Sequence, residues 1–407
     1  MYFPTVSLQR PLNNFATLQT PPRVAFLGSF PPRQCGIATF TYDVMTAVET
    51  ATNQPSVVMA MNDRPEGYAY DKQVQIKIER NDIRSYIAAS QKLAQMPIDA
   101  INIQHEYGLF GGERGEYLLE LYKRANKPIV TTLHSVIPNP DPVLRRVTGD
   151  LAQHSARLIV LANAATDILT QDYGIPRNKI KMIPHGIPTV TQPIRAHFAS
   201  KLNLGYKDRT LLSTFGLISP NKGIEFAIRA LPEVVRTHPE VLYLIIGQTH
   251  PGVRAHEGEA YRAQLQTLVN DLQLQNNVAF IDRYLSLSQL INYLLATDTY
   301  LIPYLNPTQI VSGTLAYAMG SGKAIISTPF IHAREVLGNG NGTLVPFRDS
   351  AAMTHAINNL LDHPNLRHSM EQRAYAFSRS WTWPAVAEQY VNTYKEVISH
   401  DIPISAF

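Results

Sequence analysis

The sequence has a single cysteine, Cys35, in 407 residues. One thiol cannot form a disulfide within the chain, which excludes the cysteine-stapled frameworks of small secreted domains. The N-terminus also lacks the basic start, apolar stretch and small-residue cleavage site of a secretory signal. We therefore expect a cytoplasmic protein, in a compartment that keeps thiols reduced.

Long apolar runs and clustered charges are missing as well. No run approaches the ~20 apolar residues of a transmembrane helix, and 45% hydrophobic with 17% charged residues is typical of a globular protein. The net charge is only +4, and the Lys and Arg residues are scattered rather than grouped. These features argue against a nucleic-acid partner but are compatible with an anionic small molecule.

Two series of short apolar runs organise the chain. In the first half the runs are "RVAFLG", "SVVMAM", "AINI", "PIVTTL" and "ARLIVLA". A Pro- and Thr-rich stretch, "PTVTQPIRAHF", precedes the second series, which is "TLLSTFG", "LYLIIG", "VAFI", "TYLIP", "AIIST" and "GTLVPF". Stretches with helical spacing separate the runs, so the sequence predicts an α/β fold with two halves, each built on a parallel sheet. The first residues of the chain are expected to form a surface arm without chemistry.

In open parallel sheets ligands bind beyond the carboxyl ends of the strands, so the residues that follow each run are the first candidates for a site. After "RVAFLG" comes "SFPPRQCGIATF". Gly36 would let the backbone approach a ligand and would open a helix that continues through Phe40 and Val44. The alternative is that Gly36 only permits a tight turn between strand and helix.

Polar residues follow the next runs in the same way. Gln104, His105 and Glu106 come after "AINI" on a Gly-rich loop, and His134 comes after "PIVTTL". Such groups can hydrogen-bond sugar hydroxyls or other polyols, and His134 is a candidate donor to a substrate. The alternatives are a solvated loop and an ordinary surface histidine. Because neither HExxH nor a cysteine pair occurs, we expect a site without metal.

The second half offers two features suited to a phosphate. Lys222 stands at the start of a helix, where its ammonium group could meet a phosphate; the alternative is a solvated lysine. Ser312, Gly313 and Thr314 lie where a strand passes into a helix rich in small residues. Free first-turn amides, the helix dipole, two hydroxyls and a glycine that permits close approach would together bind a diphosphate. The alternative is an ordinary capped helix.

Several segments carry a family resemblance when they are read in order: "PPRQCGIATF", "TLHS", "IPHGI", "FGLISPNKG", "QIVSGTLAYAMGSGKAI" and "WTWPAVAEQYVNTYKEV". From Arg23 to Val397 the chain resembles the retaining family 4 glycosyltransferases, which have the GT-B architecture. The resemblance implies two Rossmann-like domains that face each other, with the nucleotide-sugar mainly on the C-terminal one, the acceptor on the N-terminal one, and no metal. With the surface arm placed at 1–22, we expect domains at 23–195 and 196–382 and a C-terminal helix in 383–407 that crosses back to the first domain.

The resemblance also implies roles for single residues. The family's "GRLxPEKG" corresponds to the segment from Gly216 to Gly223, so Gly216 and the phosphate-binding Lys222 are retained, while Leu217 replaces an arginine. Gly36 and Ile37 would approach the diphosphate and sugar, and His134 would hydrogen-bond the transferred sugar.

Two family glutamates, eight positions apart, correspond to Gln309 and Tyr317. Gln309, as an amide, can still bond a sugar hydroxyl, and Tyr317 can contact the ribose or the base. In the retaining mechanism that the resemblance implies, an oxygen of the leaving diphosphate helps to deprotonate the acceptor, so no carboxylate nucleophile is required.

We therefore predict an enzyme of carbohydrate biosynthesis that moves a hexose from a UDP- or GDP-sugar to a carbohydrate or polyol, as a monomer or weak dimer. Because the nucleotide-sugar is a substrate, no cofactor is expected. A sugar phosphorylase or nucleotide-sugar epimerase on the same architecture is one alternative. A catalytically silent sugar-nucleotide-binding protein is the other, because Leu217, Gln309 and Tyr317 replace charged family residues.

Overall fold

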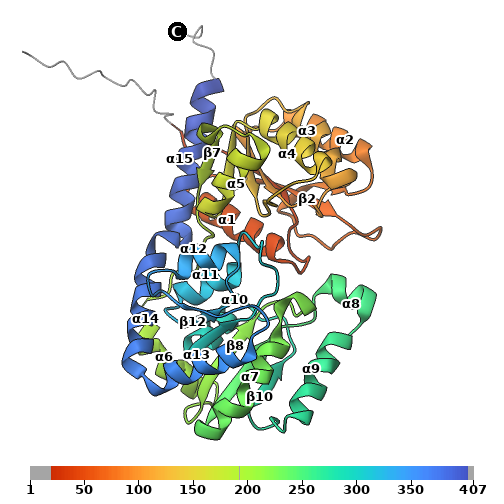
Figure 1. Ribbon diagram of the computed structural model, residues 1–407. Helices are drawn as coiled ribbons and strands as arrows, with labels where there is room; N and C mark the ends of the chain where they lie inside the picture. Colours follow the sequence, from red (N-terminus) through yellow and green to blue (C-terminus); the bar gives the residue numbers. More distant parts are fainter. Residues whose placement is uncertain (1–19, 192, 402–407) are drawn as a thin grey trace, which may run out of the picture.

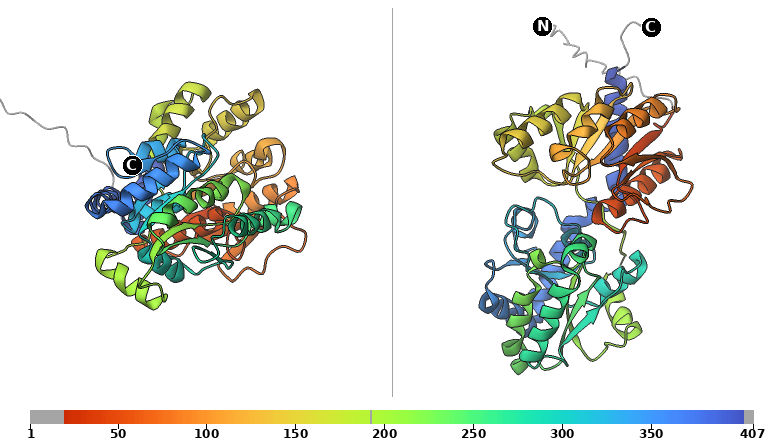
Figure 2. Two further views of the ribbon diagram at one scale, coloured as in Figure 1. Left: turned by 60° about the horizontal axis from the view of Figure 1, so that its bottom comes forward. Right: turned by 90° about the vertical axis from the view of Figure 1, so that its right-hand side faces the viewer.

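The computed structural model describes residues 20–191 and 193–401. Within them the chain forms two halves, each with a parallel β-sheet, which lie one above the other (Figures 1 and 2). The predicted α/β architecture with two Rossmann-like sheets is confirmed. The expected N-terminal arm falls almost entirely outside the described residues.

The sheet of the first half has seven strands in the order β3-β2-β1-β4-β5-β6-β7. Its strands are β1 Val24–Gly28, β2 Val57–Asn62, β3 Val74–Glu79, β4 Ala100–His105, β5 Ile129–Leu133, β6 Arg157–Val160 and β7 Ile180–Met182. Its helical elements are α1 Gly36–Thr52, α2 Ile83–Ala94, η1 Glu113–Leu118, α3 Leu119–Tyr122, α4 Pro142–His154, α5 Asn163–Tyr173 and η2 Arg177–Lys179.

The sheet of the second half has six strands in the order β10-β9-β8-β11-β12-β13. Its strands are β8 Thr210–Phe215, β9 Val241–Ile246, β10 Val278–Ile281, β11 Thr299–Ile302, β12 Ala324–Ser327 and β13 Thr343–Leu344. Its helical elements are α6 Pro193–Asn203, η3 Pro220–Lys222, α7 Ile224–Thr237, α8 Pro251–Glu257, α9 Ala260–Asp271, α10 Leu287–Ala296, α11 Gly313–Gly320, α12 Ile331–Leu337, α13 Ser350–Asp362, α14 Pro364–Phe377 and η4 Ser378–Trp381.

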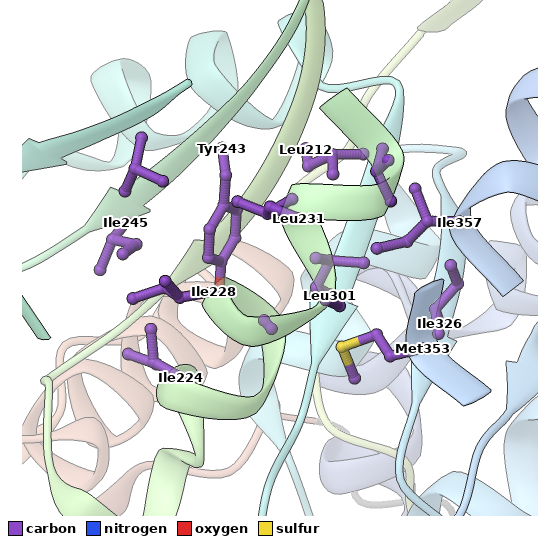
Figure 3. Close-up of a cluster of buried hydrophobic side chains, with 14 of the residues drawn as sticks. Leu212, Ile224, Ile228, Leu231, Tyr243, Ile245, Leu301, Ile326, Met353 and Ile357 are labelled. Carbon is purple, nitrogen blue, oxygen red and sulfur yellow. The ribbon is translucent and has the colours of Figure 1, made fainter. Parts of the chain in front are cut away.

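Helix α7 illustrates how the sequence builds the second core. Its apolar residues recur at helical spacing, so Ile224, Ile228 and Leu231 share one face. That face packs on Tyr243 of β9 and on Met353 of α13, and all five side chains are buried (Figure 3). Burial of each aliphatic side chain contributes about 1.5–3 kcal/mol, which outweighs the cost of Pro232 inside the helix.

The last helix, α15 Trp383–Asp401, belongs spatially to the first half (Figure 1). Its buried face includes Tyr390 and Tyr394, which pack in one cluster with Phe40 and Val44 of α1. Tyr390 is also hydrogen-bonded to Thr132 of β5, with 3.1 Å between the two hydroxyl oxygens. The end of the chain thereby ties the two halves together. None of the helices in the described ranges combines the length and hydropathy of a membrane span.

Candidate functional site

The site lies where elements that follow the strands of one half meet elements of the other half. Figure 1 shows α1 of the first half above α11 and α12 of the second. The segment after β7 lies against α11, because a β-carbon at Gly313 would lie 2.8 Å from Nε2 of His185. Farther along α11, the Tyr317 hydroxyl donates to the Asp43 carboxylate of α1 over 3.2 Å. The carboxyl ends of the two sheets therefore face a shared region.

The start of α11 is a capped helix N-terminus. Ser312 is the N-cap: its Oγ accepts from the amide of Leu315 over 3.3 Å, while its own amide donates to Nδ1 of His332 over 3.0 Å. Thr314 holds its hydroxyl 3.0 Å from that of Ser312. The capping that we weighed as an alternative is thus present, and the remaining first-turn amides still lack intrahelical acceptors. Capping and anion binding are compatible at this turn.

Gly313 is required for a reason that the sequence did not reveal. The sequence predicts that it permits close approach of a phosphate, and its φ lies outside the left-handed region, so backbone conformation does not demand a glycine. The close neighbour is instead the His185 ring of the other half. Farther along α11, a β-carbon at Gly320 would collide with the side chain of Ile187. The small residues of α11 therefore admit the segment that connects the halves, and not only the sheet.

Lys222 joins this turn through an aromatic ring. Its Nζ lies 3.9 Å from the ring centre of Tyr304, an attractive cation–π geometry. The Tyr304 hydroxyl is in turn 2.7 Å from Oγ1 of Thr314. Within the described residues no carboxylate lies within ion-pairing distance of Lys222. Gly216, after β8, lies on the same side, because its β-carbon position is 3.5 Å from the Thr314 methyl group.

Gly36 opens α1 on the opposite half. Sγ of Cys35 caps the helix and accepts from the amide of Ala38 over 3.3 Å. The amides of Gly36 and Ile37 have no intrahelical acceptor at this position. Gly36 has neither a positive φ nor an atom within 4 Å of its β-carbon position, so the tight-turn alternative does not explain the glycine. The Ile37 side chain packs against the core of the first half.

His134 follows β5 and is held by a neighbouring strand. Its Nε2 lies 2.8 Å from Oε1 of Gln104 at the end of β4. The ring packs edge-to-face on Phe40, with 4.8 Å between ring centres. Burial lowers the pKa of His134 to about 3, and the nearby His185 and His105 act in the same direction. The imidazole is therefore neutral at physiological pH.

The three residues predicted to shape an acceptor pocket have different surroundings. Gln104 and His105 are both 0% exposed, which does not support a direct contact with an acceptor. His105 stacks on Phe110, and burial lowers its pKa to about 3. Glu106 is closer to the surface; its carboxylate accepts from the Ser135 hydroxyl over 2.6 Å, and burial raises its pKa. The acceptor role of this group stays a prediction.

Gln309 and Tyr317, which the resemblance places at the positions of the family glutamates, both contact protein groups. The Gln309 side-chain amide donates to the carbonyl of Val311 over 2.9 Å, within its own loop. Tyr317 is almost fully buried and bonds Asp43 across the two halves. Burial raises the pKa of Asp43 to about 6, against the opposing effect of the Tyr317 hydrogen bond. A carboxylate is thus present near position 317, but it comes from α1.

Several residues of the site were missed. Asp43 lies seven residues after Gly36, on the same side of α1, so helical periodicity could have indicated it. His185 stands in "IPHGI" directly after β7, and the strand-end rule applies to it as to His134. Tyr304 comes two residues after β11, so the strand-end rule applies to it as well. His332 gave no local signal, because its role depends on a contact with Ser312 on another segment. Among residues 20–191 and 193–401, no cluster of three or more His, Cys, Asp or Glu side chains is arranged to hold a metal.

Comparison with known proteins identifies the family. The model of "Glycosyl transferases group 1" matches residues 198–377, and that of "Glycosyltransferase Family 4" matches 35–190. The chain is a family 4 glycosyltransferase. Between them the two matches cover the chain from 35 to 377 except for the short connection at 191–197, so the assignment includes both halves and the sequence resemblance is confirmed.

Relatives of this glycosyltransferase support the assignment. It is 25% identical over 322 residues to D-inositol 3-phosphate glycosyltransferase of Acidothermus cellulolyticus, a match that covers 73% of this chain and 68% of that protein. It is 23% identical to the GDP-mannose-dependent monoacylated alpha-(1-6)-phosphatidylinositol monomannoside mannosyltransferase of Corynebacterium glutamicum, over 89% and 95% of the two chains.

A solved structure supports the fold. The crystal structure of Anabaena Alr3699/HepE in complex with UDP superposes with a TM-score of 0.73 at 17% identity, over 92% of this chain and 100% of the other. At this identity the likeness concerns the fold, and the GT-B architecture is confirmed.

Proposed function

We propose that this glycosyltransferase transfers a hexose from a UDP- or GDP-sugar to a carbohydrate or polyol acceptor, with retention of the anomeric configuration. The observation that carries the proposal is the convergence of Lys222, the α11 N-terminus and His134 on the region shared by the two halves. Names of similar proteins agree with it: one depends on GDP-mannose, one was crystallised with UDP, and one acts on D-inositol 3-phosphate.

The donor diphosphate would bind at the start of α11. The ammonium of Lys222, which has no carboxylate partner among the described residues, supplies positive charge, and the free first-turn amides and the hydroxyls of Ser312 and Thr314 supply hydrogen bonds. Gly216 leaves room on one side, and the start of α1 at Gly36 and Ile37 approaches from the other half. Tyr304 contacts the Lys222 ammonium through its ring and the Thr314 hydroxyl through its own hydroxyl, so this one side chain would orient both groups.

The remaining predicted roles follow from this placement. His134 would bond a hydroxyl of the transferred hexose, and Gln309 would do so after release from its own loop. Tyr317 and Asp43 would lie toward the ribose. Glu106, which is closer to the surface than Gln104 and His105, is the stronger candidate for contact with an acceptor.

In this mechanism the protein positions two substrates and stabilises the leaving diphosphate, whose own oxygen assists deprotonation of the acceptor. No metal is needed when amides and Lys222 neutralise the diphosphate. We further propose a cytoplasmic enzyme that acts as a monomer or weak dimer.

A donor screen followed by product analysis tests this function. UDP, GDP and their hexose conjugates should be compared for thermal stabilisation, because a ligand at a hundred times its Kd adds about 2.7 kcal/mol. Donors that bind are then incubated with inositol, inositol phosphate and simple sugars in the presence of EDTA. Transfer that needs a divalent metal would contradict the metal-free mechanism. Turnover with inorganic phosphate and no nucleotide would indicate a phosphorylase, and isomerised donor would indicate an epimerase.

A silent sugar-nucleotide-binding protein is the second candidate. It is favoured by Gln309, whose amide is tied to its own loop where the family has a glutamate. Tight donor binding with no transfer and no donor hydrolysis across the acceptor panel would support it. A Gln309→Glu variant that gains activity would support it further.

A further inference from the structure

A chain of three buried polar side chains runs through the first half toward the site. Asn102 and Gln104 are two residues apart on β4, so their side chains lie on the same face of the sheet. The Gln104 side-chain amide donates to Oδ1 of Asn102, and Oε1 of Gln104 lies 2.8 Å from Nε2 of His134. Asn102 and Gln104 are 0% exposed. Nδ2 of Asn102 is buried without a hydrogen-bond partner among the described residues, and a partly satisfied buried network of this kind lowers stability, so it needs an explanation.

We propose that Asn102 and Gln104 are positioning residues that hold His134 in the neutral tautomer with its proton on Nε2, so that Nδ1 meets the donor sugar as a hydrogen-bond acceptor. The inference rests on the proposed function for the identity of the ligand. It goes beyond that function because it reverses the polarity first expected for His134, which we had considered as a donor.

The polarity follows from the order of donors and acceptors along the chain. Once the Gln104 amide nitrogen donates to Asn102, only Oε1 remains to face His134, and an oxygen can only accept. Nε2 of His134 must then carry the proton, and in a neutral imidazole Nδ1 is left with a lone pair. Nδ1 has no hydrogen-bond partner among the described residues, and the side chain keeps 9% of its surface exposed. We infer that a hydroxyl of the ligand donates a hydrogen bond to Nδ1 of His134.

The surroundings keep the ring neutral. The titratable groups that face it are His105 on β4 and His185 after β7, and burial lowers the pKa of both to well below neutrality. Glu106, two residues after Gln104, directs its carboxylate to Ser135. Phe40 of α1 covers one edge of the ring. Since no carboxylate in the described part of the chain pairs with it, His134 does not become the imidazolium that could donate from both nitrogens.

The consequence is a requirement on the donor sugar. The group that meets Nδ1 must be a hydroxyl, since an ether oxygen or a fluorine cannot donate. A deoxyfluoro donor with fluorine at that carbon should bind no better than the deoxy donor. If His134 were the donor, the fluoro analogue would retain part of the affinity.

The tautomer can be measured without any substrate. Long-range ¹H–¹⁵N spectra of the histidine-labelled full chain, assigned with His134→Ala, report which ring nitrogen carries the proton. We expect Nε2–H with unprotonated Nδ1 for His134 from pH 8 down to about pH 5, since burial depresses its pKa. A proton on Nδ1, or an imidazolium at pH 7, would overturn the proposal. If His134 has its proton on Nε2 but the protein binds no nucleotide-sugar, the positioning proposal holds and the proposed function is wrong.

Variants that leave His134 itself unchanged separate positioning from folding. Asn102→Leu removes the acceptor of the Gln104 amide, which can then rotate and exchange its oxygen and nitrogen, so both tautomers of His134 should appear. Asn102→Asp still accepts from Gln104 and should retain the Nε2–H form. Gln104→Glu places a carboxylate against the ring and should produce an imidazolium at pH 7. Thr131→Val, which removes a buried hydroxyl from the face of the sheet opposite to Asn102 and Gln104, is the matched control and should leave the tautomer unchanged. An unchanged His134 spectrum in folded Asn102→Leu and Gln104→Glu would also reject the proposal.

Discussion

At the scale of the residue, the site uses ordinary side chains in defined surroundings. Lys222 lies against Tyr304 and carries no counter-ion among the described residues, so its charge is available. Asp43 has the opposite character, since burial raises its pKa and makes the ionised form costly. By the resemblance, Leu217 and Tyr317 stand where the family has charged residues, and Asp43 places a carboxylate beside Tyr317.

Lys222→Ala should weaken binding of UDP and of the nucleotide-sugar alike, because both carry the diphosphate. Loss of a charge-assisted hydrogen bond costs about 1.5–3 kcal/mol, a roughly ten- to hundredfold change in Kd. Isothermal titration with UDP or GDP measures it. Lys207→Ala, an exposed lysine before β8, is the control and should leave Kd unchanged. Equal affinities of the wild type and Lys222→Ala would remove Lys222 from the site.

Asp43→Asn tests the buried carboxyl group. The folded protein binds the Asp43 proton more tightly than the unfolded chain does, since the pKa rises from 3.8 to about 6. The free energy of unfolding should therefore fall as pH rises through that window. Asparagine can still accept from Tyr317, so the variant should melt at a higher temperature than the wild type above pH 6 and at the same temperature below pH 4. The exposed Asp271→Asn is the control, and parallel pH curves for the wild type and Asp43→Asn would refute the argument.

At the scale of the element, the sequence predicted most strands and the helices that open the site. Continuous apolar runs such as "LYLIIG" form fully buried parallel strands, a pattern that needs no tertiary information. β3 was missed because only alternate residues, Ile76 and Ile78, are buried at the sheet edge. The contacts of His185 with α11 could not be predicted from the sequence, because they join segments more than a hundred residues apart.

The contact of His185 with α11 limits which side chain fits at position Gly313. Gly313→Ala should lower the melting temperature, because the new methyl group meets the His185 ring at 2.8 Å. The double variant with His185→Ala should recover most of that loss, and the coupling energy of the cycle measures the contact. Ser312→Ala should cost only about 1 kcal/mol as the loss of a helix cap. A cost of Gly313→Ala that persists in the His185→Ala background would mean that the glycine serves another purpose.

At the scale of the whole molecule, the two halves are joined by contacts other than the chain itself. Helix α15 returns to α1, Tyr317 reaches Asp43, and Thr39 of α1 lies 3.2 Å from the hydroxyl of Tyr284 after β10. Two-domain enzymes that bind substrates between their domains open and close around such contacts. Under the proposed function, the relative position of the halves should matter to activity as much as the site residues do.

Glu335 offers the sharpest test of that coupling. From α12 of the second half, its carboxylate accepts from the amides of Asn163 and Ala164 over 2.8 and 2.9 Å at the start of α5 in the first half. Helix α5 has no side-chain cap of its own, because Ala162 stands at the N-cap position in extended conformation. One carboxylate thus caps a helix and joins the halves.

These two roles of Glu335 can be separated. Glu335→Ala should lower stability by about 0.5–2 kcal/mol, as for loss of a helix cap, and should let the halves move apart. Adding Ala162→Ser restores a cap within the first half, so stability should return while the contact between halves stays broken. Melting temperature follows the first effect, and the distance between spin labels on α4 and α9 follows the second. If Ala162→Ser also restored the wild-type distance distribution, the Glu335 carboxylate would not be what holds the halves together.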